Sequence, residues 1–238
     1  MDSFTMLDSI GNKKQDIIYS GGIRTWQDFL DAKKIPGISA KRKILYDLKI
    51  RALQKAIQER NIELIKKMLP RKDYWRLYHL MLDKTLFLDI ETSEYYGDIT
   101  IIGMFSRQMD EPIIMVANHN LDEELFFRIL SSHDIIVTFN GSSFDIPIIE
   151  NFFRRKISLL HIDLRHLCAR LGLNAGLKVI EKMLGIERKH SCPDPVLYWD
   201  MWMATRSEEY LNKLVEYNKE DVMNLVHVME YCVKQLAG

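Results

Sequence analysis

Four carboxylates and a tyrosine stand in three short segments whose residue types suit metal-assisted hydrolysis. Asp89 and Glu91 are two residues apart, Asp145 follows much later, and Tyr217 lies four residues before Asp221. Clustered carboxylates repel one another unless cations lie between them, and hard oxygen ligands favour Mg²⁺ or Mn²⁺. We therefore expect a site for two divalent cations, Mg²⁺ or Mn²⁺, at which a phosphodiester is hydrolysed.

Each motif alone also has an ordinary structural explanation. Asp89 and Glu91 leave the same face of a predicted strand, which could simply be exposed to solvent. Asp145, near the start of a predicted helix, could serve only as its cap. Tyr217 and Asp221 share one helix face, as many unrelated pairs do. Because all three motifs occur together, each on a suitable element, the metal site is the favoured interpretation.

The elements that must position these residues follow from the hydrophobic pattern. Short apolar runs between turn-rich gaps predict five strands, at residues 86–90, 99–105, 112–117, 135–139 and 159–162. Helices are predicted at residues 122–131 and 144–155, and from the fifth strand onward with breaks near 172–176 and 191–195. The short gaps suit an antiparallel meander of the first three strands. The order of elements is that of a ribonuclease-H-like α/β fold, a five-stranded mixed sheet flanked by helices. In this fold the fourth strand neighbours the first, which would bring Asp145 beside Asp89.

A small all-α module is predicted to precede this domain, with the boundary between residues 1–84 and 85–238. Its longest helical stretch runs from residue 41 to 69 and ends at Pro70. The first part carries 18 Lys and Arg against 10 Asp and Glu, and the second part carries 15 against 23. A basic module joined to an acidic one suits a protein that holds a polyanion and coordinates cations. Uneven surface charge without function is the alternative.

Two pieces of the helical module echo each other, residues 10–14 and 38–42. Their layout resembles a tandem helix-hairpin-helix, whose hairpin amides hold nucleic-acid phosphates without reading bases. The copies read Ser9-Ile10-Gly11 and Gly37-Ile38-Ser39, so each keeps one of the family's two glycines. A purely structural helical cap is the alternative to a binding module. The basic residues that favour nucleic-acid binding are Lys13, Lys14, Lys41 and Arg42.

The segments 87–92, 140–145 and 217–221 resemble the three exonuclease motifs of the DEDD superfamily of 3′–5′ exonucleases. The subgroup that the chain resembles is the tyrosine one, since Tyr217 takes the place of the histidine in the other. Together with Trp75-Arg76-Leu77-Tyr78, the motifs also resemble a family of ribonuclease-H-like predicted exonucleases, over residue 73 to the C-terminus. The second motif is similar to that of family B polymerase proofreading domains.

The resemblance implies a role for each motif residue. Asp89, Glu91, Asp145 and Asp221 would bind two divalent ions, and Tyr217 would position the attacking water. The residues that would contact the terminal nucleotide are Asn140, Phe144 and Thr92.

The expected activity is a 3′–5′ exonuclease on single-stranded or frayed nucleic acid. A structure-selective endonuclease of the same fold and a catalytically inactive nucleic-acid-binding scaffold are the alternatives. DNA and RNA both remain candidate substrates, because no motif specifies contacts to the 2′-hydroxyl.

The remaining composition bears on the cellular compartment. No apolar run reaches the ~18 residues that span a bilayer, and the first residues lack the features of a signal peptide. Three cysteines without Cys-x-x-Cys spacing favour neither a disulfide framework nor a zinc cluster. We therefore expect a cytoplasmic protein without a membrane partner, and the sequence leaves protein partners open.

Overall fold

The computed structural model describes residues 3–94 and 97–237, which divide into two compact units, Met1–Leu80 and Met81–Gly238. Unit 1 is helical throughout its regular structure. Its elements are α1 (Asn12–Ser20), α2 (Trp26–Asp31), α3 (Ala40–Gln58), α4 (Ile62–Met68) and a 3₁₀ helix (Arg71–Leu80). Fully buried Phe4, Phe29 and Leu53 belong to its core.

The two segments predicted to repeat, residues 10–14 and 38–42, are preceded by similar backbone conformations. Ser9 and Gly37 both adopt left-handed conformations, with φ of 64° and 71°, and a helix begins three residues after each, at Asn12 and Ala40. Lys13, Lys14, Lys41 and Arg42 all lie in the first turns of these two helices and are exposed. The two hairpins therefore offer similar helix N-termini, each flanked by two cations.

The amphipathic stretch predicted at residues 41–69 is helical, and it is divided into two helices. α3 ends at Gln58, Arg60 has a left-handed φ of 52°, and α4 begins at Ile62. The Asn61 side chain accepts a hydrogen bond from the backbone N–H of Leu64 at 3.0 Å and so caps the new helix. An asparagine cap stops and restarts a helix without disturbing the hydrophobic period that suggested one helix.

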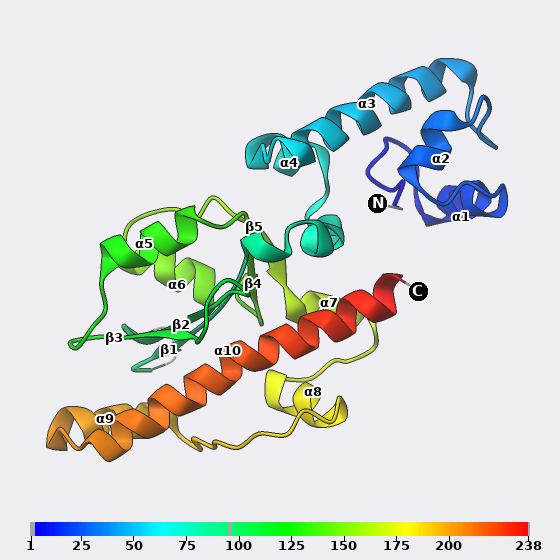
Figure 1. Cartoon of the computed structure of the whole chain (residues 1–238). Helices are drawn as coiled ribbons and strands as arrows, with labels where there is room; N and C mark the ends of the chain where they lie inside the picture. The colour runs from blue at the N-terminus through cyan, green and yellow to red at the C-terminus, as the bar shows by residue number, and fades with distance from the viewer. Residues whose placement is uncertain (1–2, 95–96, 238) are drawn as a thin grey trace. The chain divides into compact units, whose positions relative to one another are not determined.

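Unit 2 contains the predicted five-stranded mixed sheet (Figure 1). The strands are β1 (Thr85–Thr92), β2 (Ile99–Phe105), β3 (Ile113–Val116), β4 (Ile135–Thr138) and β5 (Leu160–Asp163). Their order is β3-β2-β1-β4-β5, with the first three antiparallel and with β4 parallel to both β1 and β5. The helices are α5 (Glu123–Ser131), α6 (Asp145–Phe152), α7 (Leu164–Arg170), α8 (Leu177–Met183), α9 (Pro195–Thr205) and α10 (Glu208–Ala237). The ribonuclease-H-like fold class, including the meander and the β1–β4 neighbours, is confirmed.

Strand β1 divides its side chains between two layers. Leu86, Leu88 and Ile90 are buried in a core with residues of α5 and α6. The alternate residues Asp89 and Glu91 leave the opposite face, because successive side chains of a strand point to opposite sides. That opposite face is covered by α10, which packs along β1 and β2. The strand therefore delivers its two carboxylates to the interface with the longest helix.

Helix α10 presents a buried stripe with the spacing of one helix face, including Leu214, Val222 and Leu225. Four polar residues interrupt this stripe, Tyr217, Asn218, Asp221 and Asn224, and all four are at least 95% buried. Buried polar groups need partners, so their presence marks the place where the helix faces polar groups of the sheet.

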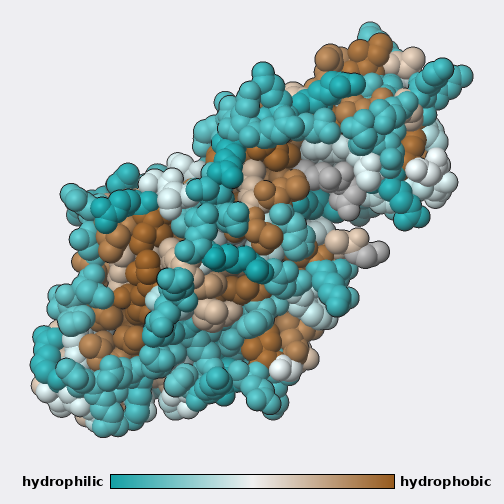
Figure 2. Space-filling view, viewed as in Figure 1, coloured by the Kyte–Doolittle hydropathy of each residue, from teal (hydrophilic) through white to brown (hydrophobic). Residues whose placement is uncertain are grey.

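The visible surface is mostly hydrophilic with scattered apolar patches (Figure 2). In unit 1, Ile44, Leu45 and Leu48 of α3 are among the exposed apolar residues. No helix within residues 3–94 and 97–237 combines the length and apolar character needed to cross a membrane.

Candidate metal site and active-site cleft

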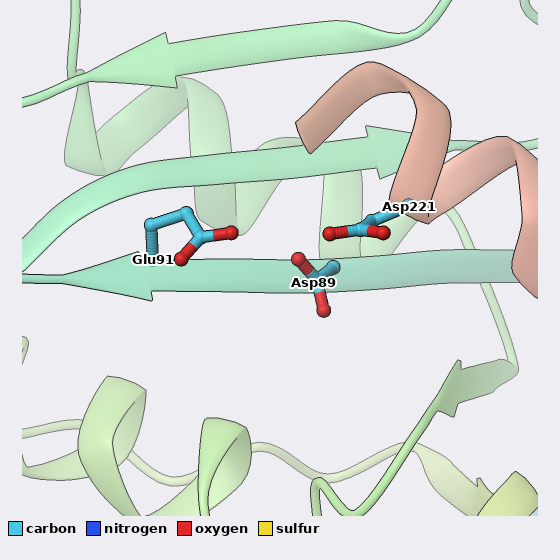
Figure 3. Close-up of side chains that lie close together, drawn as sticks. All are labelled: Asp89, Glu91 and Asp221. Atoms are coloured by element: carbon cyan, nitrogen blue, oxygen red, sulfur yellow. The ribbon is translucent and has the colours of Figure 1, made fainter. Parts of the chain in front are cut away.

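Asp89 and Glu91 of β1 meet Asp221 of α10 at one point of the sheet surface (Figure 3). One oxygen from each of the three carboxyl groups lies within 4.8 Å of the other two. Three oxygens at this spacing can share one cation, and all are the hard donors that Mg²⁺ and Mn²⁺ prefer. The structure therefore brings together residues from two motifs that are 130 positions apart in the chain, Glu91 and Asp221.

Gly103 of β2 allows α10 to approach the sheet this closely. It lies opposite Asp89 in the antiparallel register. A Cβ atom at this position would lie 2.1 Å from Asn218 Oδ1 and 2.7 Å from Val222 Cγ2. Any larger residue would push the helix outward, and with it Tyr217 and Asp221.

Asn218 fixes the carboxylate of Asp89 from the helix side. Its Nδ2 donates a hydrogen bond to Asp89 Oδ2 at 2.9 Å, and its side chain is fully buried. This bond fixes the orientation of the Asp89 carboxylate beside Glu91 and Asp221. An amide in this place holds a ligand without adding charge, which suits a cation site.

Asp145 reaches the same region from the first residue of α6. Its Oδ1 accepts a hydrogen bond from the backbone N–H of Ile90 at 3.2 Å, between the two β1 carboxylates. Asp145 is not the helix cap that the sequence left as an alternative, since Phe144 holds the N-cap position. It stands outside the three-carboxylate group, beside Asp89 rather than within it.

The site resists ionisation of its own carboxylates. Burial, followed by repulsion from Asp221, raises the pKa of Asp89 well above its ordinary range and that of Glu91 to about 8. Burial also raises the pKa of Asp145 to about 7, although hydrogen bonds to the backbone oppose the shift. The pKa of Asp221 is raised by burial as well, while the positive charge of Arg188 acts against it. Divalent cations would relieve this repulsion, so the residues fit a magnesium or manganese centre.

A cavity of about 350 Å³ opens onto these residues. Its polar part is formed by Asp89, Glu91, Asp221 and the Tyr217 side chain, and Ile90, Phe139 and Leu177 supply apolar wall. Lys178 adds a cation at the rim, with its Nζ 4.7 Å from the centre of the Tyr217 ring. The same cavity thus offers oxygen ligands, an apolar surface and a positive charge.

The residues predicted to contact a terminal nucleotide have other positions. Thr92 is buried and donates a hydrogen bond to the Glu94 carbonyl at 2.6 Å. Phe144 is half-buried and packs against the core beneath α5 and α6. Asn140 has a left-handed φ of 66°, and its Oδ1 accepts a hydrogen bond from Arg165 at 2.7 Å. In the described part of the chain, none of the three lines the cavity of the carboxylates.

Five further residues at the site carried no recognisable signal in the sequence. Asn218 and Gly103 matter only because α10 crosses β2 at one point. Lys178 lies at the cavity rim, and two charged residues approach Asp221 from α8 and the segment after it. These two are Glu181 and Arg188.

The family comparison agrees with the observed fold. A family model described as the RNase H superfamily matches residues 86–233. Among solved structures, the chain is similar to a family B DNA polymerase from the hyperthermophilic archaeon Pyrobaculum calidifontis, at 13% identity with a TM-score of 0.47. That match covers 60% of this chain and 24% of the polymerase chain. No curated protein matches the sequence significantly. Because the family model matches more than half of this chain, the chain belongs to the RNase H superfamily.

Proposed function

We propose that this protein is a 3′–5′ exonuclease that hydrolyses phosphodiester bonds of single-stranded or frayed nucleic acid. The observation that carries the proposal is the meeting of Asp89, Glu91 and Asp221 within 4.8 Å, beside Tyr217, in a cavity at the sheet surface. The RNase H superfamily contains nucleases, and the arrangement resembles the tyrosine subgroup of DEDD exonucleases.

The four carboxylates would hold two divalent cations, Mg²⁺ or Mn²⁺. Asp89, Glu91 and Asp221 are spaced to hold one of them, and Asp145 lies where it could share Asp89 for the other. When bound, two such cations lower the pKa of the attacking water and stabilise charge on the leaving 3′ oxygen. Asn218 and the Ile90 N–H keep the carboxylates in place for this chemistry.

Tyr217 would position the attacking water through its hydroxyl group. Burial and the surrounding carboxylates raise the pKa of Tyr217 above its ordinary value, so its hydroxyl keeps its proton at neutral pH. A protonated hydroxyl can donate a hydrogen bond to substrate or accept one from water, but it cannot act as a general base. Its contribution is therefore orientation.

The apolar wall of the cavity suits a base or sugar at a strand terminus, which favours cleavage at an end. Asn140, Phe144 and Thr92 would then act further along the strand or in shaping the cleft. We propose that residues 1–84 act as a separate module that attracts the nucleic-acid backbone through Lys13, Lys14, Lys41 and Arg42. The three cysteines are free and buried, in keeping with the cytoplasmic location that we propose.

The test is degradation of 5′-labelled single-stranded DNA and RNA by the full chain, with Mn²⁺, with Mg²⁺ and with EDTA. We expect a ladder of products shortened one nucleotide at a time from the 3′ end, only with metal. The same ladder must disappear in Asp221→Asn, which keeps the shape of the ligand but removes its charge.

The two alternatives predict different products. Discrete internal cuts that depend on metal would favour the endonuclease. Binding of either strand without metal-dependent loss would favour the inactive scaffold and contradict the proposal.

A further inference from the structure

The Asp221 carboxylate has a charged neighbour that the proposed chemistry does not use. Arg188 Nη1 lies 2.6 Å from Asp221 Oδ1, and its side chain is only 17% exposed. The guanidinium also lies over the Tyr217 ring, 5.1 Å from its centre. Arg188 therefore contacts both residues of the third motif, and it does so from the segment that follows α8.

A second carboxylate holds Arg188 from the other side. The same Nη1 donates a hydrogen bond to Glu181 Oε2 at 2.7 Å. Glu181 belongs to α8 and is completely buried, so the guanidinium is a counter-charge to a carboxylate that solvent does not reach. One nitrogen thus joins a carboxylate outside the proposed metal site to a carboxylate inside it.

The backbone on the C-terminal side of Arg188 is also attached to α10. The carboxylate of Glu220 accepts hydrogen bonds from the N–H of Lys189 at 2.6 Å and of His190 at 2.9 Å. Glu220 directly precedes Asp221 in the helix. The chain that carries Arg188 is therefore tied to α10 next to Asp221, and the guanidinium itself is held by Glu181.

An arginine suits this position for two reasons. Its charge is permanent, which offsets part of the repulsion among Asp89, Glu91 and Asp221 when no divalent cation is present. Its planar set of donors can serve two carboxylates in one fixed geometry, whereas a lysine supplies only a flexible point charge. A cation that binds Asp221 must then share this carboxylate with a positive neighbour.

Resting on the proposed function, we propose that Arg188, held by Glu181, is a positioning residue that orients Asp221 and neutralises the carboxylate cluster before metal binds. The positive charge of Arg188 then has opposite effects on the stability of the metal-free protein and on its affinity for divalent cations. Arg188 stabilises the metal-free protein, and it weakens the affinity of the site for divalent cations. The site thereby stays ordered without metal and can still bind and release divalent cations readily.

The test compares Arg188→Gln with the wild-type full chain in two assays that need no substrate. Thermal unfolding in EDTA should occur at a lower temperature in the variant, because Glu181 and Asp221 lose their counter-charge. Mn²⁺ binding, followed by the electron paramagnetic resonance signal of free Mn²⁺, should tighten by about tenfold. Turnover should nevertheless fall by about 10–100-fold, because Asp221 is no longer oriented.

Two further variants keep the test decisive if Arg188→Gln folds poorly. Arg188→Lys retains the charge, so its Mn²⁺ affinity should stay near wild type while turnover falls. Glu181→Gln should weaken Mn²⁺ binding, since the guanidinium beside Asp221 then has one carboxylate fewer to balance its charge. Arg107→Gln is the matched control, because it removes another ion pair to α10, the one with Glu230, and should leave Mn²⁺ affinity unchanged.

The outcomes separate this inference from the proposed function. If the wild type binds Mn²⁺ and Arg188→Gln binds it equally or more weakly, the role of Arg188 is refuted and the metal site stands. If the wild type binds no Mn²⁺ at all, both the metal site and the role of Arg188 are refuted.

Discussion

Buried Asp73 of unit 1 and the carboxylate cluster of unit 2 lie in different surroundings. In unit 1, buried Asp73 pairs with Arg76 at 3.3 Å and also accepts a hydrogen bond from Thr5. In unit 2, carboxylates of like charge are gathered at one point, and burial raises the pKa of each. In a buried pair of opposite charges, each charge compensates the other. A buried cluster of like charges instead requires a ligand of the opposite sign.

The cations at the two hairpins of unit 1 are exposed to solvent, unlike the carboxylate cluster of unit 2. Lys13 and Lys41 are exposed at the starts of two helices, where solvent screens them. Exposed cations attract a polyanion over a distance but do not specify its identity. Chemical specificity should therefore depend on unit 2, and overall attraction on unit 1.

The largest effect is expected at Asp89, which would be a ligand of both cations in the proposed site. Asp89→Asn should lower nuclease turnover by about 10³-fold or more, because an amide holds a divalent cation poorly. Steady-state rates on a labelled oligonucleotide measure this loss. Asp200→Asn, at an exposed acid of α9, is the matched control and should retain full activity. Equal loss in both variants would mean that unit 2 depends on general negative charge rather than on the cluster.

Tyr217→Phe should lower turnover by about 10–100-fold while Mn²⁺ affinity stays unchanged. Only the hydroxyl is removed, and the ring keeps its packing against Trp199 and Leu214. Parallel measurements of kcat and of Mn²⁺ binding check this separation. A parallel loss of Mn²⁺ binding would assign the hydroxyl to the metal site itself instead of to the water.

Gly103→Ala tests whether the closeness of α10 to the sheet maintains the cluster. The added methyl group should lower stability by about 1–3 kcal/mol, since it would meet Asn218 and Val222. Thermal unfolding should therefore occur about 3–10 °C earlier, with weakened Mn²⁺ binding. Gly176→Ala, where a Cβ would have no neighbour within 4 Å, is the control. Unchanged stability in Gly103→Ala would refute the tight packing at this crossing.

The metal-free protein should lose stability as the pH rises. The pKa of Glu91 is raised from 4.5 to about 8, so the folded state holds a proton that the unfolded state releases over this range. This contribution is complete below about pH 4.5 and is lost as the pH approaches 8. Unfolding temperatures in EDTA between these limits should fall less steeply in Glu91→Gln than in the wild type. Identical slopes would contradict the raised pKa of Glu91.

The smallest effect is expected in unit 1. Replacing Lys13, Lys14, Lys41 and Arg42 by alanine should weaken nucleic-acid binding severalfold and flatten its salt dependence by a slope of about 2–3. Turnover at saturating substrate should stay the same, because the cluster in unit 2 is untouched. Lys33→Ala with Lys34→Ala serves as the control for exposed charge outside the hairpins. An equal effect in the control would leave the hairpins without a specific role.

The regular pattern of the chain predicted much of unit 2. Short apolar runs between turn-rich gaps predicted the five strands and the meander, because buried strands are short and apolar and the gaps between them are local. The positions of Asp89 and Glu91 on one strand face followed from the alternation of side chains along a strand. The break at Arg60 escaped prediction because a single capping residue ends a helix without altering its hydrophobic period.

The neighbours of the proposed ligands could not be predicted in the same way. Asn218, Gly103 and Arg188 act through contacts between elements far apart in the chain. Such contacts depend on how closely α10 crosses β2 and where the segment after α8 returns. Neither quantity is encoded in a local pattern, so only the folded structure reveals these residues.

The most direct test of the central claim is a crystal structure of the full chain soaked in Mn²⁺, with anomalous data collected at the manganese absorption edge. We expect an anomalous peak bound by Asp89, Glu91 and Asp221, with a second ion beside Asp145. Absence of any peak among these carboxylates at millimolar Mn²⁺, in a protein folded as described, would contradict the account.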